Sequence, residues 1–294
     1  MKILITGSTG FVGKHLVPKL LQNGYKLLEI TIEPEISEKL YGNKTLKCVV
    51  SEDQDKLKNS IESFKPEVVI HLASYLTSND DYLTLQKLLN TNISFYCRIL
   101  DALKNTDIKL FVNTGTFAEY YKGDNIFDPA YLYAATKTAT RSFLDYYSKV
   151  YQFKQATVVP YTIYGGKDTQ KKIIDIMYDS LSSSTPIDLS PGEQVLDFIH
   201  IDDVTDFYLA LVDNVENLPA KSNFQLGTGK GHTLKQVAAI IEEATQRKTN
   251  INWGGKPYRP SDVMYAVAEL KNSLFVFNPI DIHLGVNKYL QNNG

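Results

Sequence analysis

A tyrosine and a lysine stand four residues apart at Tyr133 and Lys137, in the stretch YLYAATK. The surrounding residues have the pattern of a helix. Residues four apart lie on one helical face, so the phenol and the ammonium can point to one place. A nearby ammonium favours the phenolate and lowers the pKa of a phenol from its ordinary value of about 10. The spacing alone fits either a proton-transfer pair or two polar side chains on a helix surface.

A second candidate for chemistry is the glycine turn TGSTGFVG, residues 6–13. Gly7, Gly10 and Gly13 have the spacing GxxGxxG, which differs from the GxGxxG fingerprint. A tight turn of this kind lets backbone N–H groups and a helix N-terminus meet a pyrophosphate. It follows an apolar strand and opens a helix, which is the context that such a motif needs. We therefore predict a dinucleotide site here, with a purely structural turn as the alternative.

Strands alternate with helices through the first half of the chain. We expect strands at 2–6, 26–32, 45–50, 67–73, 108–114 and 155–161, and helices at 11–24, 54–64, 86–105 and 131–152. This alternation predicts an α/β fold with a Rossmann-type, doubly wound parallel sheet.

The second half has a looser pattern. Helices are expected near 170–182, 202–214, 233–246 and 279–291. We predict a dinucleotide-binding domain at 1–165 and a smaller C-terminal substrate lobe at 166–294. The two are interleaved, with segments around 195–228 returning to the first domain. The lobe should lie over the carboxyl ends of the strands, where open α/β sheets bind ligands.

Composition excludes several classes of function. The chain has 294 residues, of which 43% are hydrophobic, and a net charge of −2, which gives no electrostatic argument for nucleic acid or a membrane surface. No apolar run approaches the length of a membrane span, and the opening residues lack the features of a signal peptide. The five histidines have no metal-ligand spacing, and Cys48 and Cys97 are interpreted as free thiols. We expect a cytoplasmic protein that acts on a small molecule without a metal.

Several motifs together resemble one family. They are TGSTGFVG, VVIHLAS, NTN, VNTGTFAEY and YAATK, followed by VPYTIYGG, VLDFIHIDDV, FQLGTGKGHTL and YRPSDV. In this order they resemble the extended short-chain dehydrogenase/reductases of the NAD-dependent epimerase/dehydratase family, which modify nucleotide sugars. The resemblance spans nearly the whole chain and implies a Rossmann-type domain with a C-terminal sugar-nucleotide lobe.

The resemblance implies three catalytic residues. Tyr133 would exchange a proton with a sugar oxygen, Thr116 would hold that oxygen, and Lys137 would also bind the cofactor ribose. The nicotinamide carries the hydride, and the protein sets the geometry. The implied cofactor-binding residues are Gly7, Ser8, Thr9, Gly10, Phe11, Val12, Gly13, Thr31, Glu33, Leu72, Ala73, Ser74, Asn92, Thr114, Tyr133, Lys137 and Pro160. Within this region, we interpret His71 as a satisfied core histidine and Asn92 as structural.

The choice between NAD and NADP depends on the end of the second strand. The acid that binds the adenosine ribose is expected at Thr31, so the acid itself is missing there, and Glu29 and Glu33 flank the position. No lysine or arginine lies between residues 27 and 38 to hold a 2′-phosphate. This pattern favours NAD over NADP.

The residues after the catalytic threonine bear on the reaction. Family dehydratases carry an acid pair where Phe117 and Ala118 stand, and Glu119 comes one residue too late. A reductase or an epimerase with tightly bound NAD remains. The short C-terminal part resembles the 4-keto-6-deoxyhexose reductases of O-antigen sugar pathways, such as the CDP-abequose and CDP-paratose synthases, and we favour a reductase. A non-catalytic dinucleotide sensor is disfavoured because Tyr133 and Lys137 are retained.

The resemblance also implies substrate residues and an assembly state. The implied substrate residues are Thr116, Phe117, Thr162 and Arg259. Two arginines that family members often carry are replaced by Val159 and Leu196, so Arg259 is the candidate for a diphosphate, which its fork can bind in bidentate fashion. The alternative is a surface arginine paired with Asp262. Helices 86–105 and 131–152 resemble the pair that forms the interface of family homodimers.

Overall fold

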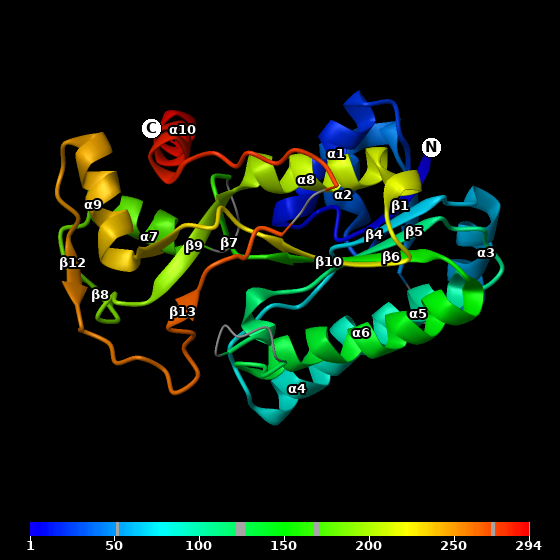
Figure 1. Ribbon diagram of the computed structural model, residues 1–294, viewed down its shortest axis with the longest axis horizontal. Helices are drawn as coiled ribbons and strands as arrows, with labels where there is room; N and C mark the ends of the chain where they lie inside the picture. Colours follow the sequence, from blue (N-terminus) through cyan, green and yellow to red (C-terminus); the bar gives the residue numbers. More distant parts are fainter. Residues whose placement is uncertain (51–52, 122–126, 167–170, 272–273, 294) are drawn as a thin grey trace.

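Seven parallel strands form the main sheet in the order β10-β6-β5-β4-β1-β2-β3 (Figure 1). The computed structural model describes residues 1–50, 53–121, 127–166, 171–271 and 274–293. The strands are β1 (Lys2–Thr6), β2 (Lys26–Thr31), β3 (Leu46–Val49), β4 (Val68–His71), β5 (Leu110–Thr114), β6 (Lys154–Pro160) and β10 (Lys221–Leu226). The strand order reverses at β1, so the predicted doubly wound Rossmann-type sheet is confirmed.

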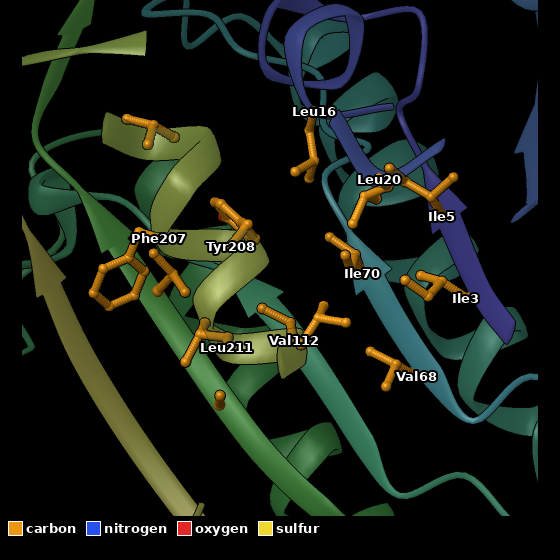
Figure 2. Packing of buried hydrophobic residues seen from close by; sticks show 14 of the residues in the cluster. Ile3, Ile5, Leu16, Leu20, Val68, Ile70, Val112, Phe207, Tyr208 and Leu211 are labelled. Carbon is orange, nitrogen blue, oxygen red and sulfur yellow. The ribbon is translucent and has the colours of Figure 1, made fainter. Parts of the chain in front are cut away.

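Helices cover both faces of this sheet (Figure 1). They include α1 (Phe11–Gln22) and α8 (Ile201–Asp213) on one face, and α3 (Gln54–Phe64), α5 (Phe95–Ala102) and α6 (Leu132–Tyr151) on the other. Figure 2 shows Leu16 and Leu20 of α1 near Ile5 and Ile70, while Tyr208 and Leu211 of α8 lie nearer Val112. The strands are apolar on both sides because helices bury both faces.

Two local predictions need correction. A helix that was not predicted, α2 (Pro34–Tyr41), follows β2, and it begins with proline at a position that suits a first helical turn. The expected helix 86–105 begins instead with α4 (Tyr82–Leu88), capped by Asp81, and passes through a π-helical turn, η2 (Leu89–Ser94), before α5. The π turn holds Asn92 buried in the core, and such turns often mark functional sites.

The remaining elements form a second cluster beside the sheet (Figure 1). They are β7 (Thr162–Tyr164), α7 (Ile173–Ser180), β8 (Ile187–Leu189), β9 (Val195–His200), β11 (Gly231–Thr233), α9 (Leu234–Thr245), β12 (Ile251–Trp253), β13 (Tyr265–Ala266) and α10 (Ile282–Asn293). Strand β9 pairs with β7, β11 and β13, and β8 pairs with β12. Between β9 and β11 the chain forms α8 and then β10, which is the edge strand of the main sheet. The division at residue 165 stays a prediction.

Asp197 of β9 connects three segments, and its role was not predicted. Its fully buried carboxylate accepts hydrogen bonds from the backbone N–H groups of Thr228 (2.8 Å), Gly229 (2.8 Å) and Ala268 (3.2 Å). A buried carboxylate needs donors of this kind to offset its desolvation. Asp197 therefore stabilises the loops that follow β10 and β13.

Two further expectations concern membranes and metals. Across the described ranges, no helix is long and apolar enough to cross a bilayer. In the same part of the chain, no group of three or more His, Cys, Asp or Glu side chains could hold a metal ion.

Candidate active site

A cavity of about 760 Å³ lies at the carboxyl ends of β1, β2 and β4. Eight of the predicted cofactor residues line it: Gly7, Thr9, Gly10, Thr31, Glu33, Leu72, Ala73 and Ser74. Ligands of open α/β sheets bind at this edge, where the strand order reverses. Lys14, Phe95 and Arg98 also line the cavity, and none of them was predicted from the sequence.

The glycine turn forms one wall of this cavity. Gly7 has φ +70°, and a Cβ there would lie 2.6 Å from the backbone N of Ala73. A Cβ on Gly13 would lie 2.2 Å from the carbonyl oxygen of Gly7. Gly10 caps α1 without a side-chain hydrogen bond, so the first N–H groups of the helix have no side-chain acceptor there. These features fit a pyrophosphate bound by backbone N–H groups.

Glu33 is the acid that faces the cavity. Its carboxylate accepts a hydrogen bond from the Thr9 hydroxyl (2.6 Å), and its backbone N–H donates to the Thr31 hydroxyl (2.9 Å). Glu29 is fully buried and accepts hydrogen bonds from Ser37 and Thr45. The missing acid at Thr31 is therefore replaced by a carboxylate two residues later, which stays a candidate partner for ribose hydroxyls.

The other predicted cofactor residues are not among those that line this cavity. Ser8 and Gly13 are buried beneath the turn, and Val12 packs against the core. The Phe11 ring lies under the Lys172 ammonium, 4.2 Å from its centroid. Thr114 is bonded to the Tyr208 hydroxyl (2.6 Å), and Pro160 pairs with Leu226 at the end of β6.

Tyr133 and Lys137 are both buried on one face of α6. Burial raises the pKa of Tyr133 to about 12, and the neighbouring Ser74 hydroxyl opposes part of that rise. Burial lowers the pKa of Lys137 to about 8, while the Glu119 carboxylate raises it and the Arg141 guanidinium lowers it. Without a bound cofactor, burial is the largest influence on this pKa and opposes the lowering expected from the neighbouring ammonium. The phenol is held in its protonated form.

Thr116 lies at the turn after β5. It is buried and caps a short helix, η3 (Phe117–Glu119), with its hydroxyl accepting from the Ala118 N–H at 3.3 Å. Its own N–H donates to the Glu119 carboxylate at 2.9 Å. Tyr208 of α8 approaches the same region, since it is bonded to Thr114 and its pKa is raised by burial and by Tyr133.

A smaller pocket of about 170 Å³ lies next to the catalytic candidates, and Arg259, Phe117, Tyr131, Leu196 and Val263 are among its lining residues. The Arg259 guanidinium donates to the Ser78 hydroxyl at 2.8 Å. Asp262 accepts from the backbone N–H of Arg259 at 2.9 Å, so the two residues are in contact through the backbone of Arg259. Tyr131 connects the two sites because its ring stacks on that of Tyr133, with centroids 6.1 Å apart. Thr162 lies on β7, outside the lining of this pocket.

Residues 3–227 match the model of the NAD-dependent epimerase/dehydratase family. The chain belongs to this family. A CDP-abequose synthase of Yersinia pseudotuberculosis is 28% identical over 264 residues, covering 90% of this chain and 91% of that protein.

Solved structures of other proteins share this fold. One is a UDP-glucuronic acid 4-epimerase from Bacillus cereus in complex with UDP-glucuronic acid and NAD. It has a TM-score of 0.86 at 20% identity, and the superposition covers 100% of each chain. A UDP-glucose 4-epimerase from Thermotoga maritima with UDP-glucose has a TM-score of 0.84 at 22% identity, with coverage of 100% and 99%. The protein is thus an enzyme of an NAD-dependent family.

Two buried polar residues of this family member, His71 and Asn92, have hydrogen-bond partners within the fold. The His71 ring nitrogen Nδ1 lies 3.0 Å from the Thr6 hydroxyl. Asn92 donates to the Thr136 hydroxyl (2.9 Å) and accepts from the Tyr75 N–H (2.7 Å). Asn92 therefore joins the segment after β4 to α6, the helix that carries Tyr133.

His71 should make the folded state sensitive to acid. Burial, and then the charge of Lys137, lowers its pKa to about 3, against 6.5 for a free side chain. Below about pH 6.5 the unfolded chain binds a proton at this side chain, whereas the folded protein does not. The stability that neutral His71 contributes is therefore fully present above pH 6.5 and is lost as pH falls. We expect the free energy of unfolding to fall by about 2 kcal/mol between pH 7 and pH 5 from this group alone. Urea unfolding of wild type and His71→Asn at both pH values measures the difference, and equal losses in the two proteins would contradict it.

Proposed function

We propose that the protein reduces a nucleotide-linked 4-keto-6-deoxyhexose with NADH or NADPH, in the synthesis of a surface-polysaccharide sugar. The observation that carries this proposal is the position of Ser74. It lines the cofactor cavity, and its hydroxyl neighbours the Tyr133 phenol. The proposed proton donor is therefore next to a residue that lines the cavity suited to a dinucleotide.

The residues support a reduction as follows. The reduced nicotinamide, when bound, supplies a hydride to the carbonyl carbon of the sugar. Tyr133 donates its proton to the carbonyl oxygen, which becomes a hydroxyl, and the phenolate regains a proton from solvent. Thr116 holds the same oxygen by a hydrogen bond. Burial keeps the phenol protonated, so Tyr133 has a proton to supply to the carbonyl oxygen.

The cavity supports NAD as the preferred cofactor. The Glu33 carboxylate can accept hydrogen bonds from ribose hydroxyls, and its charge would repel a 2′-phosphate. Lys14 and Arg98 also line the cavity, and Arg98 donates from Nε to the Gln54 side chain at 2.9 Å. NADH is therefore expected to bind more tightly than NADPH.

The small pocket supports a deoxygenated sugar attached to a diphosphate. Arg259 supplies a cation, while Phe117, Leu196 and Val263 supply apolar surface beside it. The relative named CDP-abequose synthase agrees with a nucleotide-linked sugar. A dehydratase is disfavoured because Glu119 is fully buried and its carboxylate is bound by the Arg141 side chain at 2.6 Å.

One experiment separates the reductase from the epimerase. The purified protein is denatured, and the released small molecules are identified by mass. A site that is empty but binds NADH reversibly, together with NADH oxidation in the presence of a nucleotide-linked 4-keto-6-deoxyhexose, supports the reductase. Near-stoichiometric NAD⁺ that survives dialysis supports the epimerase and refutes the reductase.

Replacing Arg259 tests the substrate pocket. Arg259→Met removes the cation proposed to bind the diphosphate, and we expect KM for the nucleotide sugar to rise by about 10- to 100-fold. The Kd for NADH should stay unchanged, because Arg259 does not line the larger cavity. Arg247→Met is the control, since Arg247 is also exposed and donates to the Leu181 carbonyl at a distance from this pocket. An unchanged KM in Arg259→Met would contradict the assignment.

We further propose a homodimer formed through α4, η2 and α6. Exposed apolar side chains gather there: Tyr82, Leu83, Leu89, Phe143, Tyr146, Val150 and Tyr151. Light scattering should give twice the chain mass of 33.1 kDa. Tyr146→Glu should yield monomers, whereas Leu284→Glu, at an equally exposed apolar site on α10, should not. A wild-type mass of one chain at micromolar concentration would refute the dimer.

A further inference from the structure

A buried ion pair lies behind the catalytic candidates. The Glu119 side chain is fully buried, and Arg141 is 14% exposed. The guanidinium contacts both carboxylate oxygens, from Nε to Oε2 at 2.6 Å and from Nη2 to Oε1 at 3.2 Å. Two buried charges lose their hydration, and their attraction only offsets that loss, so such a pair is weak evidence for added stability. Its contacts point to another role.

Glu119 fixes the turn that carries Thr116. Its Oε1 accepts from the Thr116 N–H at 2.9 Å, and a Cβ on Gly115 would lie 2.5 Å from the same oxygen. The carboxylate thus lies directly against the backbone of residues 115–116. Only a glycine at 115 leaves room for this contact.

Arg141 connects Glu119 to α6, the helix that carries Tyr133 and Lys137. It follows Lys137 by four residues, as Lys137 follows Tyr133, so the three side chains share one face of α6. Arg141 also donates from Nη1 to the Asn223 side chain at 3.0 Å, which connects the helix to β10. The pair therefore joins the turn after β5 to the face of α6 that carries Tyr133 and Lys137.

The charges of the pair act on Lys137 in opposite directions. Glu119 favours its ammonium, and Arg141 disfavours it. The other titratable groups near Lys137 are Tyr133 on the same helix and His71 of β4, and burial keeps both uncharged at neutral pH. If one charge of the pair is removed, the effect of the other on the Lys137 pKa is no longer offset.

We propose that Glu119 and Arg141 are positioning residues, which hold the Thr116 hydroxyl and the charged Lys137 ammonium in register with Tyr133. The proposal rests on the reductase function above. In this role the pair touches neither substrate nor cofactor, and it acts through Thr116 and Lys137.

The test compares single and paired variants. Glu119→Gln keeps an oxygen for the Thr116 N–H but loses the charge, so the fall in kcat at alkaline pH should move to lower pH by about one unit. Arg141→Met should move it to higher pH by about one unit. The apolar pair Glu119→Leu with Arg141→Met should fold, because apolar replacement of a buried pair is often neutral, yet lose about tenfold in kcat.

The matched control is Glu242→Gln. Glu242 accepts from Lys248 (2.6 Å) and from the Thr249 N–H (3.0 Å), so it has the same kinds of donor in a distant part of the fold. This variant should change neither kcat nor its pH profile. If the pair is purely structural, all Glu119 and Arg141 variants will have a lower melting temperature. Their kcat and the pH dependence of kcat in Glu119→Gln and Arg141→Met will then be those of wild type. That result would overturn the proposal.

A second readout does not need turnover. Lysine labelled with ¹³C at Cε reports the titration of Lys137 by NMR, with the resonance assigned by its loss in Lys137→Arg. Its midpoint should lie near 8 in wild type, and Glu119→Gln should lower it and Arg141→Met should raise it. Equal midpoints in all three proteins would refute the pair's action on Lys137. If wild type reduces no nucleotide sugar, the reductase proposal fails while this titration still decides the role of the pair.

Discussion

Replacing Tyr133 by phenylalanine should lower kcat by about 10³-fold and leave the Kd for NADH within about twofold. The phenol is buried beside Ser74, a residue that lines the candidate cofactor cavity, and burial keeps on it the proton that the proposed reduction would consume. Phenylalanine fills the same space without a proton to donate. Single-turnover oxidation of bound NADH, followed by absorbance, measures the chemical step directly.

The control for this variant is Tyr147→Phe on the same helix. Tyr147 stacks on Tyr151 and lies away from the cavity, so loss of its hydroxyl should leave kcat unchanged. A Tyr133→Phe protein that keeps a tenth of wild-type turnover would exclude Tyr133 as the proton donor. Cofactor binding in both proteins, with no turnover by wild type on any nucleotide sugar, would instead favour a dinucleotide sensor.

Replacing Gly13 by alanine should weaken NADH binding by at least about 100-fold. The added Cβ would lie 2.2 Å from the Gly7 oxygen and 2.5 Å from the Ser8 oxygen. Both are backbone atoms, so the glycine turn must open, and its N–H groups then leave the positions that suit a pyrophosphate. Fluorescence titration with NADH measures the loss, and circular dichroism checks that the variant is folded.

Two other glycines calibrate this result. Gly10→Ala meets only the Gly7 oxygen at 3.3 Å, so it should fold normally and lose affinity by about tenfold. Gly24→Ala has φ +78° but no atom within 4 Å of its Cβ, so it should lose about 1 kcal/mol of stability and no affinity for NADH. Equal NADH affinities in Gly13→Ala and wild type would show that the dinucleotide binds elsewhere.

Much of the fold follows from local patterns. The alternation of apolar strands with amphipathic helices predicted the parallel sheet, because burial on both faces leaves a periodic trace in the chain. Helix α2 and the π turn at 89–94 were missed. The first is short, with only Ser37 and Tyr41 buried, and the second depends on the hydrogen bonds of one buried residue, Asn92.

Local patterns in the sequence predict which residues can do chemistry. Three glycines between a strand and a helix, and a tyrosine four residues before a lysine, are local signals that a turn and a helix convert directly into geometry. Their spacing in the chain specifies which backbone groups and which side chains share a face. The family follows from the order of such motifs along the chain.

The environment of those residues, in contrast, depends on how the whole chain packs. Burial holds the Tyr133 phenol protonated, although the neighbouring lysine alone predicted the opposite shift. Of the two acids that flank Thr31, Glu33 lines the cavity, whereas Glu29 is fully buried and does not. Glu119 meets Arg141, 22 residues away in the chain. Burial and long-range contacts arise when distant segments pack together, and no local pattern of residues records them.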